Sequence, residues 1–199
     1  MPRFRPALVT LLATFLSTGT LRAQEVWDVT QPRGETREID FTTTEGTWMS
    51  LDVAPDGRSI VFDLLGHVYR VSTQGGEAES LTQGSGIAVN FDPRYSPDGQ
   101  TVAFVSDRSG QYNLWLMDAD GGNPRPVFES GNIRAYEPHW TPDGEYIIVR
   151  RQPGGLWMYH RDGGEGVSVL ADGLGPAAWP SVSSDGRYLY FQLSKGRTL

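Results

Sequence analysis

The stretch Pro55-Asp56-Gly57-Arg58-Ser59-Ile60-Val61-Phe62 decides the fold, because the chain repeats it with small changes. Asp-Gly returns at Asp98-Gly99, Asp143-Gly144 and Asp185-Gly186, at spacings of 42, 45 and 42 residues. An apolar triplet follows each pair within a few residues. An Asp-Gly pair after proline or serine is the chemistry of a tight turn, in which glycine takes a positive φ. Between apolar runs it predicts an antiparallel hairpin, so the sequence predicts four hairpins in phase.

A second marker indicates that each repeat holds more than one hairpin. Tyr69, Trp115 and Trp157 each lie seven residues before the second glycine of a Gly-Gly pair, and an apolar residue follows five residues after each pair. These constant offsets predict two further strands joined by a tight turn. Four short strands in about 43 residues are typical of a propeller blade. The alternative, a β-sandwich, gives no reason for a regular period.

The predicted fold is therefore all-β: a β-propeller with blades of four antiparallel strands, of which about three and a half are present. Residues 24–47 form an extended N-terminal segment ahead of the repeats at 48–199. The blades are expected at about 48–83, 90–130, 135–172 and, cut short, 177–199. Open sheet faces favour association. We therefore expect the natural gene to continue with more blades, and residues 24–199 alone to aggregate or oligomerise.

Residues 1–23 have the three-part pattern of a secretory signal peptide. Arg3 and Arg5 precede a largely apolar run, and small residues lead to Ala23 before the expected cut. About ten apolar residues are too few to span a membrane, which takes about 20. The sequence predicts an exported protein, periplasmic or extracellular, with no stable membrane insertion after cleavage.

Composition excludes several kinds of function. The net charge is −7, and a nucleic-acid partner usually requires a basic surface. There is no cysteine, so an exported fold is held without disulfides. The three histidines include no His-x-His pair, and no Gly-x-Ser-x-Gly pattern occurs. Neither a metal site nor a catalytic residue is expected in this chain. Gly84-Ser85-Gly86 is interpreted as a flexible loop between the first two blades.

Candidate binding residues are expected where the innermost strands begin, facing a central channel. Asp92 and Arg94 lie seven and five residues before the turn glycine of the second repeat, and Glu137 and His139 do so in the third. Strand alternation would place each pair on one side. The alternative is that these four are ordinary solvated polar residues at strand ends.

The repeat resembles the TolB-type propeller, a relative of the WD-type blade, from about Trp48 to the C-terminus. A narrower resemblance is to the N-terminal propeller region of large secreted proteins in which such a propeller precedes an amidohydrolase domain. The segments that carry the narrower resemblance are Asp28 to Gly34, Ile39 to Thr43, Gly46 to Met49, Val61 to Gly66 and Trp157 to Gly166.

This resemblance implies a non-catalytic module that shapes access to a downstream catalytic domain or docks a protein or peptide partner. It implies no cofactor in this chain, and a divalent metal only in a downstream amidohydrolase domain. Two alternatives stay open: a stand-alone TolB-like interaction propeller, and the propeller of a prolyl-oligopeptidase-type serine peptidase. The sequence beyond Leu199 distinguishes the three.

Overall fold

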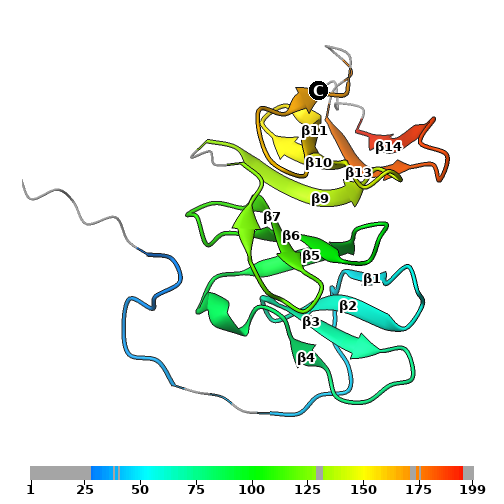
Figure 1. Ribbon diagram of the computed structural model, residues 1–199. Helices are drawn as coiled ribbons and strands as arrows, with labels where there is room; N and C mark the ends of the chain where they lie inside the picture. The colour runs from blue at the N-terminus through cyan, green and yellow to red at the C-terminus, as the bar shows by residue number, and fades with distance from the viewer. Residues whose placement is uncertain are drawn as a thin grey trace, which may run out of the picture.

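In a computed structural model, the described part of the chain forms three four-stranded antiparallel sheets and a two-stranded sheet (Figure 1). The structure describes residues 28–37, 39, 41–128, 132–170, 174 and 176–194. The signal peptide expected at residues 1–23 lies outside them. The predicted all-β fold of four-stranded blades is confirmed.

In each sheet the strands follow one another in sequence order, and we number the sheets as blades 1 to 4. Blade 1 holds β1 (Leu51–Val53), β2 (Ser59–Leu64), β3 (His67–Ser72) and β4 (Glu79–Ser80). Blade 2 holds β5 (Asn90–Tyr95), β6 (Thr101–Ser106), β7 (Asn113–Asp118) and β8 (Arg125–Pro126). Blade 3 holds β9 (Arg134–Trp140), β10 (Tyr146–Gln152), β11 (Gly155–His160) and β12 (Val167–Ser168). Blade 4 holds β13 (Ala177–Val182) and β14 (Leu189–Leu193).

The Asp-Gly pairs form the turns between the first two strands of each blade, as predicted. Gly57 has φ 69°, and its N–H donates to the Ala54 carbonyl at 2.8 Å. The Asp56 carboxylate accepts the Arg58 N–H at 2.9 Å, so the aspartate stabilises the turn from its own side chain. The same aspartate bond recurs in the other three repeats, at 3.0, 3.0 and 3.1 Å.

Apolar side chains fill the spaces between successive blades. The cluster between blades 1 and 2 comprises Ala54, Val61, Val68, Leu81, Tyr95, Val102, Phe104, Trp115 and Met117. Trp115 turns its ring towards blade 1, and Trp157 packs in the same way on the cluster between blades 2 and 3. The two rings thus occupy equivalent positions, although Trp115 is buried and Trp157 is partly exposed.

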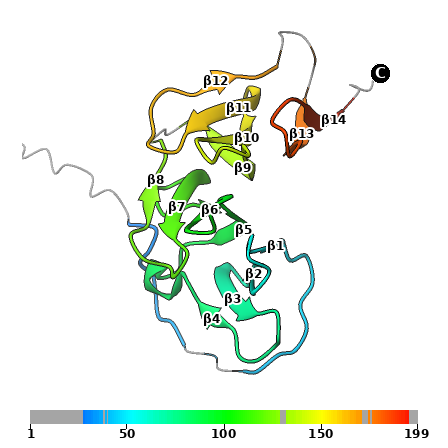
Figure 2. The same cartoon turned by 45° about the vertical axis from the view of Figure 1, so that its right-hand side comes forward.

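The blades stand so that their first strands meet and their last strands lie apart. β1 contacts β5, β5 contacts β9 and β9 contacts β13. In Figure 2 the last strands β4, β8 and β12 lie on the opposite side of their sheets from the first strands β1, β5 and β9. The first strands are therefore the innermost ones, and residues on them face the propeller axis.

The connection between blades 1 and 2 differs from the flexible loop expected from its glycines. It forms a 3₁₀ helix, η1 (Gln83–Ser85), and Ser85 is buried. The Ser85 hydroxyl donates to the Thr82 carbonyl at 2.7 Å and accepts from Asn90 Nδ2 at 2.9 Å. Just beyond it, the Ile87 N–H donates to the Thr30 carbonyl at 3.2 Å. These contacts fix the connection in place.

Candidate functional site

The innermost strands of blades 2, 3 and 4 share an irregularity at one repeat position. The β-ladder shifts register at Asp92-Pro93, Glu137-Pro138 and Trp179-Pro180. The residue before each proline has a positive φ, of 54°, 55° and 56° in turn. A positive φ is uncommon outside glycine and is found where surrounding structure enforces it. Bulges of this kind re-aim the side chains of a strand.

The bulges overturn the simple alternation expected along these strands. Arg94 pairs with Ala103, and Phe91 pairs with Val105, so Arg94 shares a sheet face with Phe91. Across the bulge, the two-residue spacing from Asp92 to Arg94 no longer places both on one side. The same shift separates Glu137 from His139 in blade 3.

Each bulge connects neighbouring blades through a carboxylate. Asp63 Oδ2 accepts the Asp92 N–H at 2.8 Å, and Asp92 Oδ2 accepts the Glu137 N–H at 3.3 Å. Glu137 Oε2 then accepts the Trp179 N–H at 2.7 Å. We call Asp63, Asp92 and Glu137 the carboxylate relay. Because a charged acceptor makes a stronger bond than a neutral one, the relay holds the strained residues of blades 2, 3 and 4 in place.

The two ends of the relay differ in their electrostatic surroundings. Glu137 is paired with Arg150, whose Nε lies 2.9 Å from Oε1 and whose guanidinium stacks over Tyr136 at 4.5 Å. Asp63 Oδ1 accepts the Ser50 N–H at 3.0 Å. Burial raises the pKa of Asp63, and the nearby charge of Asp92 adds to the rise. The hydrogen bonds from the Ser50 and Asp92 N–H groups and the charge of Arg94 lower the pKa. Asp63 is therefore a buried carboxylate whose charge is stabilised by two backbone N–H groups and by Arg94.

Arg94 and His139 lie beside the relay, between blades 1 and 3. Arg94 Nη1 donates to the Ser50 hydroxyl at 2.8 Å, so it ties blade 2 to the residue just before β1. The Arg94 carbonyl accepts the Trp140 indole N–H at 3.2 Å from blade 3. Burial lowers the pKa of His139, and the charge of Arg94 lowers it further, while Asp52 opposes both. All four predicted site residues thus lie at the junctions of the inner strands; their role in binding stays a prediction.

A pocket of about 560 Å³ opens beside this relay, at the end of the propeller where β5 begins. It is lined by Trp48, Met49, Ser50, Asp63, Leu65, Gly66, Val89, Asn90, Phe91, Asp92, Tyr112 and Trp179. The side chains of Trp48 and Trp179 are 100% and 64% exposed. The sequence reasoning missed Asp63 and both tryptophans. Trp179 was within reach, since it lies seven residues before its turn glycine, as Asp92 and Glu137 do.

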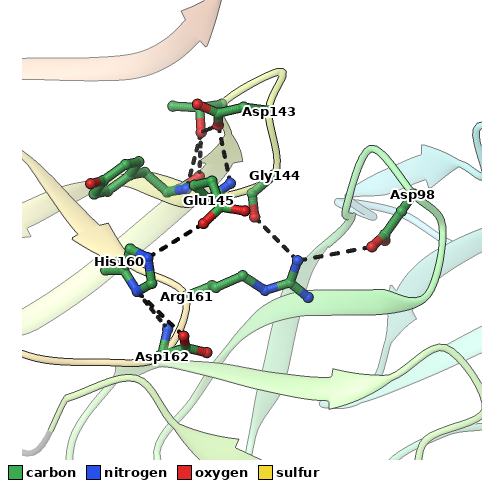
Figure 3. A network of polar contacts seen from close by, with 9 residues as sticks. Asp98, Asp143, Gly144, Glu145, His160, Arg161 and Asp162 are labelled. Atoms are coloured by element: carbon green, nitrogen blue, oxygen red, sulfur yellow. Dashed lines mark hydrogen bonds and ion pairs between the residues drawn. The ribbon is translucent and has the colours of Figure 1, made fainter.

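A second polar cluster lies at the other end of the blades, among the Asp-Gly turns (Figure 3). Arg161 Nη2 donates to the Thr101 hydroxyl at 3.1 Å. Its Nη1 lies 3.9 Å from Asp98 Oδ2 (Figure 3). Its guanidinium also lies 5.5 Å from the centre of the Trp140 ring. Arg161 therefore joins blade 3 to blade 2 at the turns, which is a structural role.

Within the described part of the chain, no group of three or more His, Asp or Glu side chains is placed to hold a metal ion. Among the same residues, no helix has the length and apolar character needed to cross a membrane.

Known proteins with the same repeats include peptidases and TolB. A family model described as the TolB beta propeller domain matches residues 34–198. An uncharacterized peptidase of Bacillus subtilis, YuxL, is 39% identical over 41% of this chain and 12% of its own length. The Tol-Pal system protein TolB of Wolinella succinogenes is 30% identical over 58% of this chain and 27% of its own. A solved structure assigned to TolB of Agrobacterium tumefaciens superposes with a TM-score of 0.62 at 26% identity, covering 72% of this chain and 53% of that one. The chain thus spans well under two thirds of each of these relatives.

Proposed function

Because this chain belongs to the TolB β-propeller domain family, we propose that it is the docking or access module of an exported protein, itself without catalytic residues. The observation that carries the proposal is the pocket beside the relay. Residues of blades 1, 2 and 4 meet there, two tryptophans are left in contact with water, and the supporting backbone is held by charged hydrogen bonds. Concave sites with exposed aromatic side chains are where proteins usually bind partners.

We assign the module to the N-terminal part of an amidohydrolase-like hydrolase. Support for this parent comes from the sequence segments that resemble such proteins, which include the Gly46 to Met49 turn ahead of β1. The matched peptidase YuxL favours a second candidate, the propeller of a serine peptidase. The matched TolB favours a third, a stand-alone periplasmic interaction propeller.

The reading frame beyond Leu199 distinguishes these parents. A His-x-His pair at the end of a strand, followed by further His and Asp ligands, would support the amidohydrolase. A Gly-x-Ser-x-Gly motif between a strand and a helix would support the peptidase and exclude the first proposal. Further blades followed by a stop codon would leave only the stand-alone propeller.

Docking itself is tested by photo-cross-linking in the full-length protein. A photoreactive amino acid at Leu65, which lines the pocket, is expected to capture peptide or protein partners in the native host. The same amino acid at Tyr190, which is 61% exposed on β14, is the control. Equal adducts at both positions, or none at Leu65, would contradict a docking site at this pocket.

Export is tested by the N-terminus of the protein purified from its native host. Mass spectrometry is expected to find a chain that starts close to Gln24, because signal peptidases cut after small residues such as Ala23. Intact Met1 in a periplasmic or extracellular fraction would show that the segment is not cleaved.

A further inference from the structure

We propose that the pocket beside the relay binds an arginine side chain of a peptide partner, with the guanidinium placed between the tryptophan rings and the two carboxylates that line the pocket. This proposal rests on the docking function above and adds the chemistry of the partner. Three independent features of the pocket carry it: its aromatic rim, its strained backbone and its negative charge.

The rim is formed by two tryptophans from opposite ends of the described chain. Trp48 precedes blade 1 and Trp179 belongs to blade 4, and the pocket brings their side chains to one opening. Tryptophan normally buries its large ring, so two rings at 100% and 64% exposure are unusual. Tryptophan is also the side chain whose face attracts cations most strongly. Arginine is the cation best suited to it, since its flat guanidinium stacks on aromatic rings.

Backbone strain is concentrated at the same opening. Six non-glycine residues among those described have a positive φ. Four of these six line the pocket: Trp48 at 59°, Leu65 at 52°, Asp92 at 54° and Trp179 at 56°. Strained residues persist where surrounding structure holds them, and they gather at binding sites because the strain fixes side chains in place. The backbone thus sets the direction in which each tryptophan leaves the chain before any ligand arrives.

Negative charge lies at the base of the pocket. Asp63 and Asp92 both line it, and burial together with the charge of Asp92 raises the pKa of Asp63. Arg94 opposes that rise from outside the pocket lining. Both oxygens of Asp63, and Oδ2 of Asp92, have a second lone pair beyond the N–H that each accepts from the backbone. A guanidinium can use these lone pairs in a bidentate pair, which an ammonium cannot do.

Competing occupants fit these features less well. An acidic peptide would be repelled by the carboxylates and by the net charge of −7. An uncharged apolar peptide would place no positive charge beside Asp63 and Asp92. At about 560 Å³ the pocket is within the size range of ligand sites and has room for a long side chain with part of its backbone.

The experiment is a titration of the full chain with blocked pentapeptides, followed by tryptophan fluorescence and by the indole N–H signals in NMR spectra. The probes are acetyl-Ala-Ala-X-Ala-Ala-amide with X as Arg, Lys, Leu or Glu. We expect the Arg peptide to bind with a Kd of about 1 mM or tighter and to shift the Trp48 and Trp179 signals. The Lys peptide should bind about 3- to 10-fold more weakly, and raising the salt to about 1 M should weaken both.

Matched variants separate the pocket from other surfaces. Trp48→Ala removes a fully exposed ring, so the fold should be unaffected, while the Kd of the Arg peptide should rise at least about 5-fold. Asp92→Asn should raise it by a similar factor. Tyr190→Ala and Glu165→Gln, which change an exposed ring and an exposed charge elsewhere, should leave it unchanged.

The outcomes distinguish this proposal from the docking function on which it rests. Equal or tighter binding of the Leu or Glu peptide at this pocket would overturn the arginine site and leave docking standing. Binding of the Arg peptide that Trp48→Ala does not weaken would also overturn it. No binding by any peptide up to about 10 mM would overturn the arginine site. Docking would then depend on the photo-cross-linking result alone.

Discussion

The substitution Glu137→Ala tests whether the carboxylate relay supports the inner strands. It removes the acceptor of the Trp179 N–H at 2.7 Å and the partner of Arg150 at 2.9 Å. Breaking a buried ion pair by removing one partner costs about 3–5 kcal/mol, and an unpaired buried N–H costs about 1–3 kcal/mol. The Arg150 side chain is 22% exposed, so water offsets part of its loss. We therefore expect the free energy of unfolding to fall by about 2–4 kcal/mol in total.

Urea denaturation of the full chain, followed by tryptophan fluorescence, measures this change. Hydrogen exchange of β13 (Ala177–Val182) locates the destabilisation. Exchange should speed up first in this strand, because the Trp179 N–H has lost Glu137 as its acceptor. The matched control is Glu145→Ala. Glu145 lies in the same blade, but its side chain is 55% exposed, and its one ion pair, to His160, has N and O 3.5 Å apart. An exposed pair of this kind contributes about 0–1 kcal/mol.

A second variant separates the charge of Glu137 from its shape. Glu137→Gln keeps one acceptor oxygen and the length of the side chain, so we expect a smaller loss of about 1–2 kcal/mol. Equal unfolding free energies for Glu137→Ala and Glu145→Ala, with unchanged exchange in β13, would refute the structural role of the relay.

Three further predictions concern the blades. Trp115→Ala should lower the free energy of unfolding by about 3–5 kcal/mol, and Trp157→Ala by less because its ring is partly exposed. Urea titration measures both changes. A loss below about 1 kcal/mol for Trp115→Ala would mean that the ring is not in the core and that the strand's residues are assigned to the wrong faces. The Thr141 hydroxyl, followed by the Glu145 N–H, lowers the pKa of Asp143 from 3.8. The stability this adds is present above pH 3.8 and is lost as the pH falls through the lower folded pKa, so acid titration of Asp143→Asn should lack that part of the loss. Gly86→Ala should release residues 28–31, seen as faster hydrogen exchange at Ile87, because a Cβ there would collide with the Thr30 carbonyl and φ is +60°.

The hairpins were predictable because their chemistry is local. The aspartate, its bonded N–H and the positive-φ glycine all lie within three residues, as at Asp56 to Arg58, so sequence letters contain the whole turn. The connection at Gly84 to Gly86 was wrongly interpreted as flexible for the opposite reason. Its order depends on Asn90 and on Thr30, and no rule of spacing connects those residues to a Gly-Ser-Gly sequence.

The candidate site was only partly predictable, because the prolines on the inner strands change the direction of the side chains next to them. The distance from the turn glycines identifies Asp92 and Glu137. The two-residue alternation of side chains along a strand, however, does not continue across Pro93 and Pro138. Proline has no N–H to give to the ladder, and in sheets it is found at edges or bulges. An acidic residue directly before proline on an inner strand was the available sign of a bulge. Asp63 had no such sign, because it lies on β2 and meets Asp92 only in the folded chain.

In blade 4, a tryptophan, Trp179, occupies the position that a carboxylate residue occupies in blades 2 and 3. In blades 2 and 3 this residue donates its N–H to a carboxylate of the preceding blade, and its own carboxylate accepts an N–H of the next blade. Trp179 donates its N–H to Glu137 and has the same strained φ, but an indole has only a donor and cannot accept a further N–H. The strain at this position therefore does not serve a further relay step. It holds a large, exposed ring at the pocket, where a ligand can reach it.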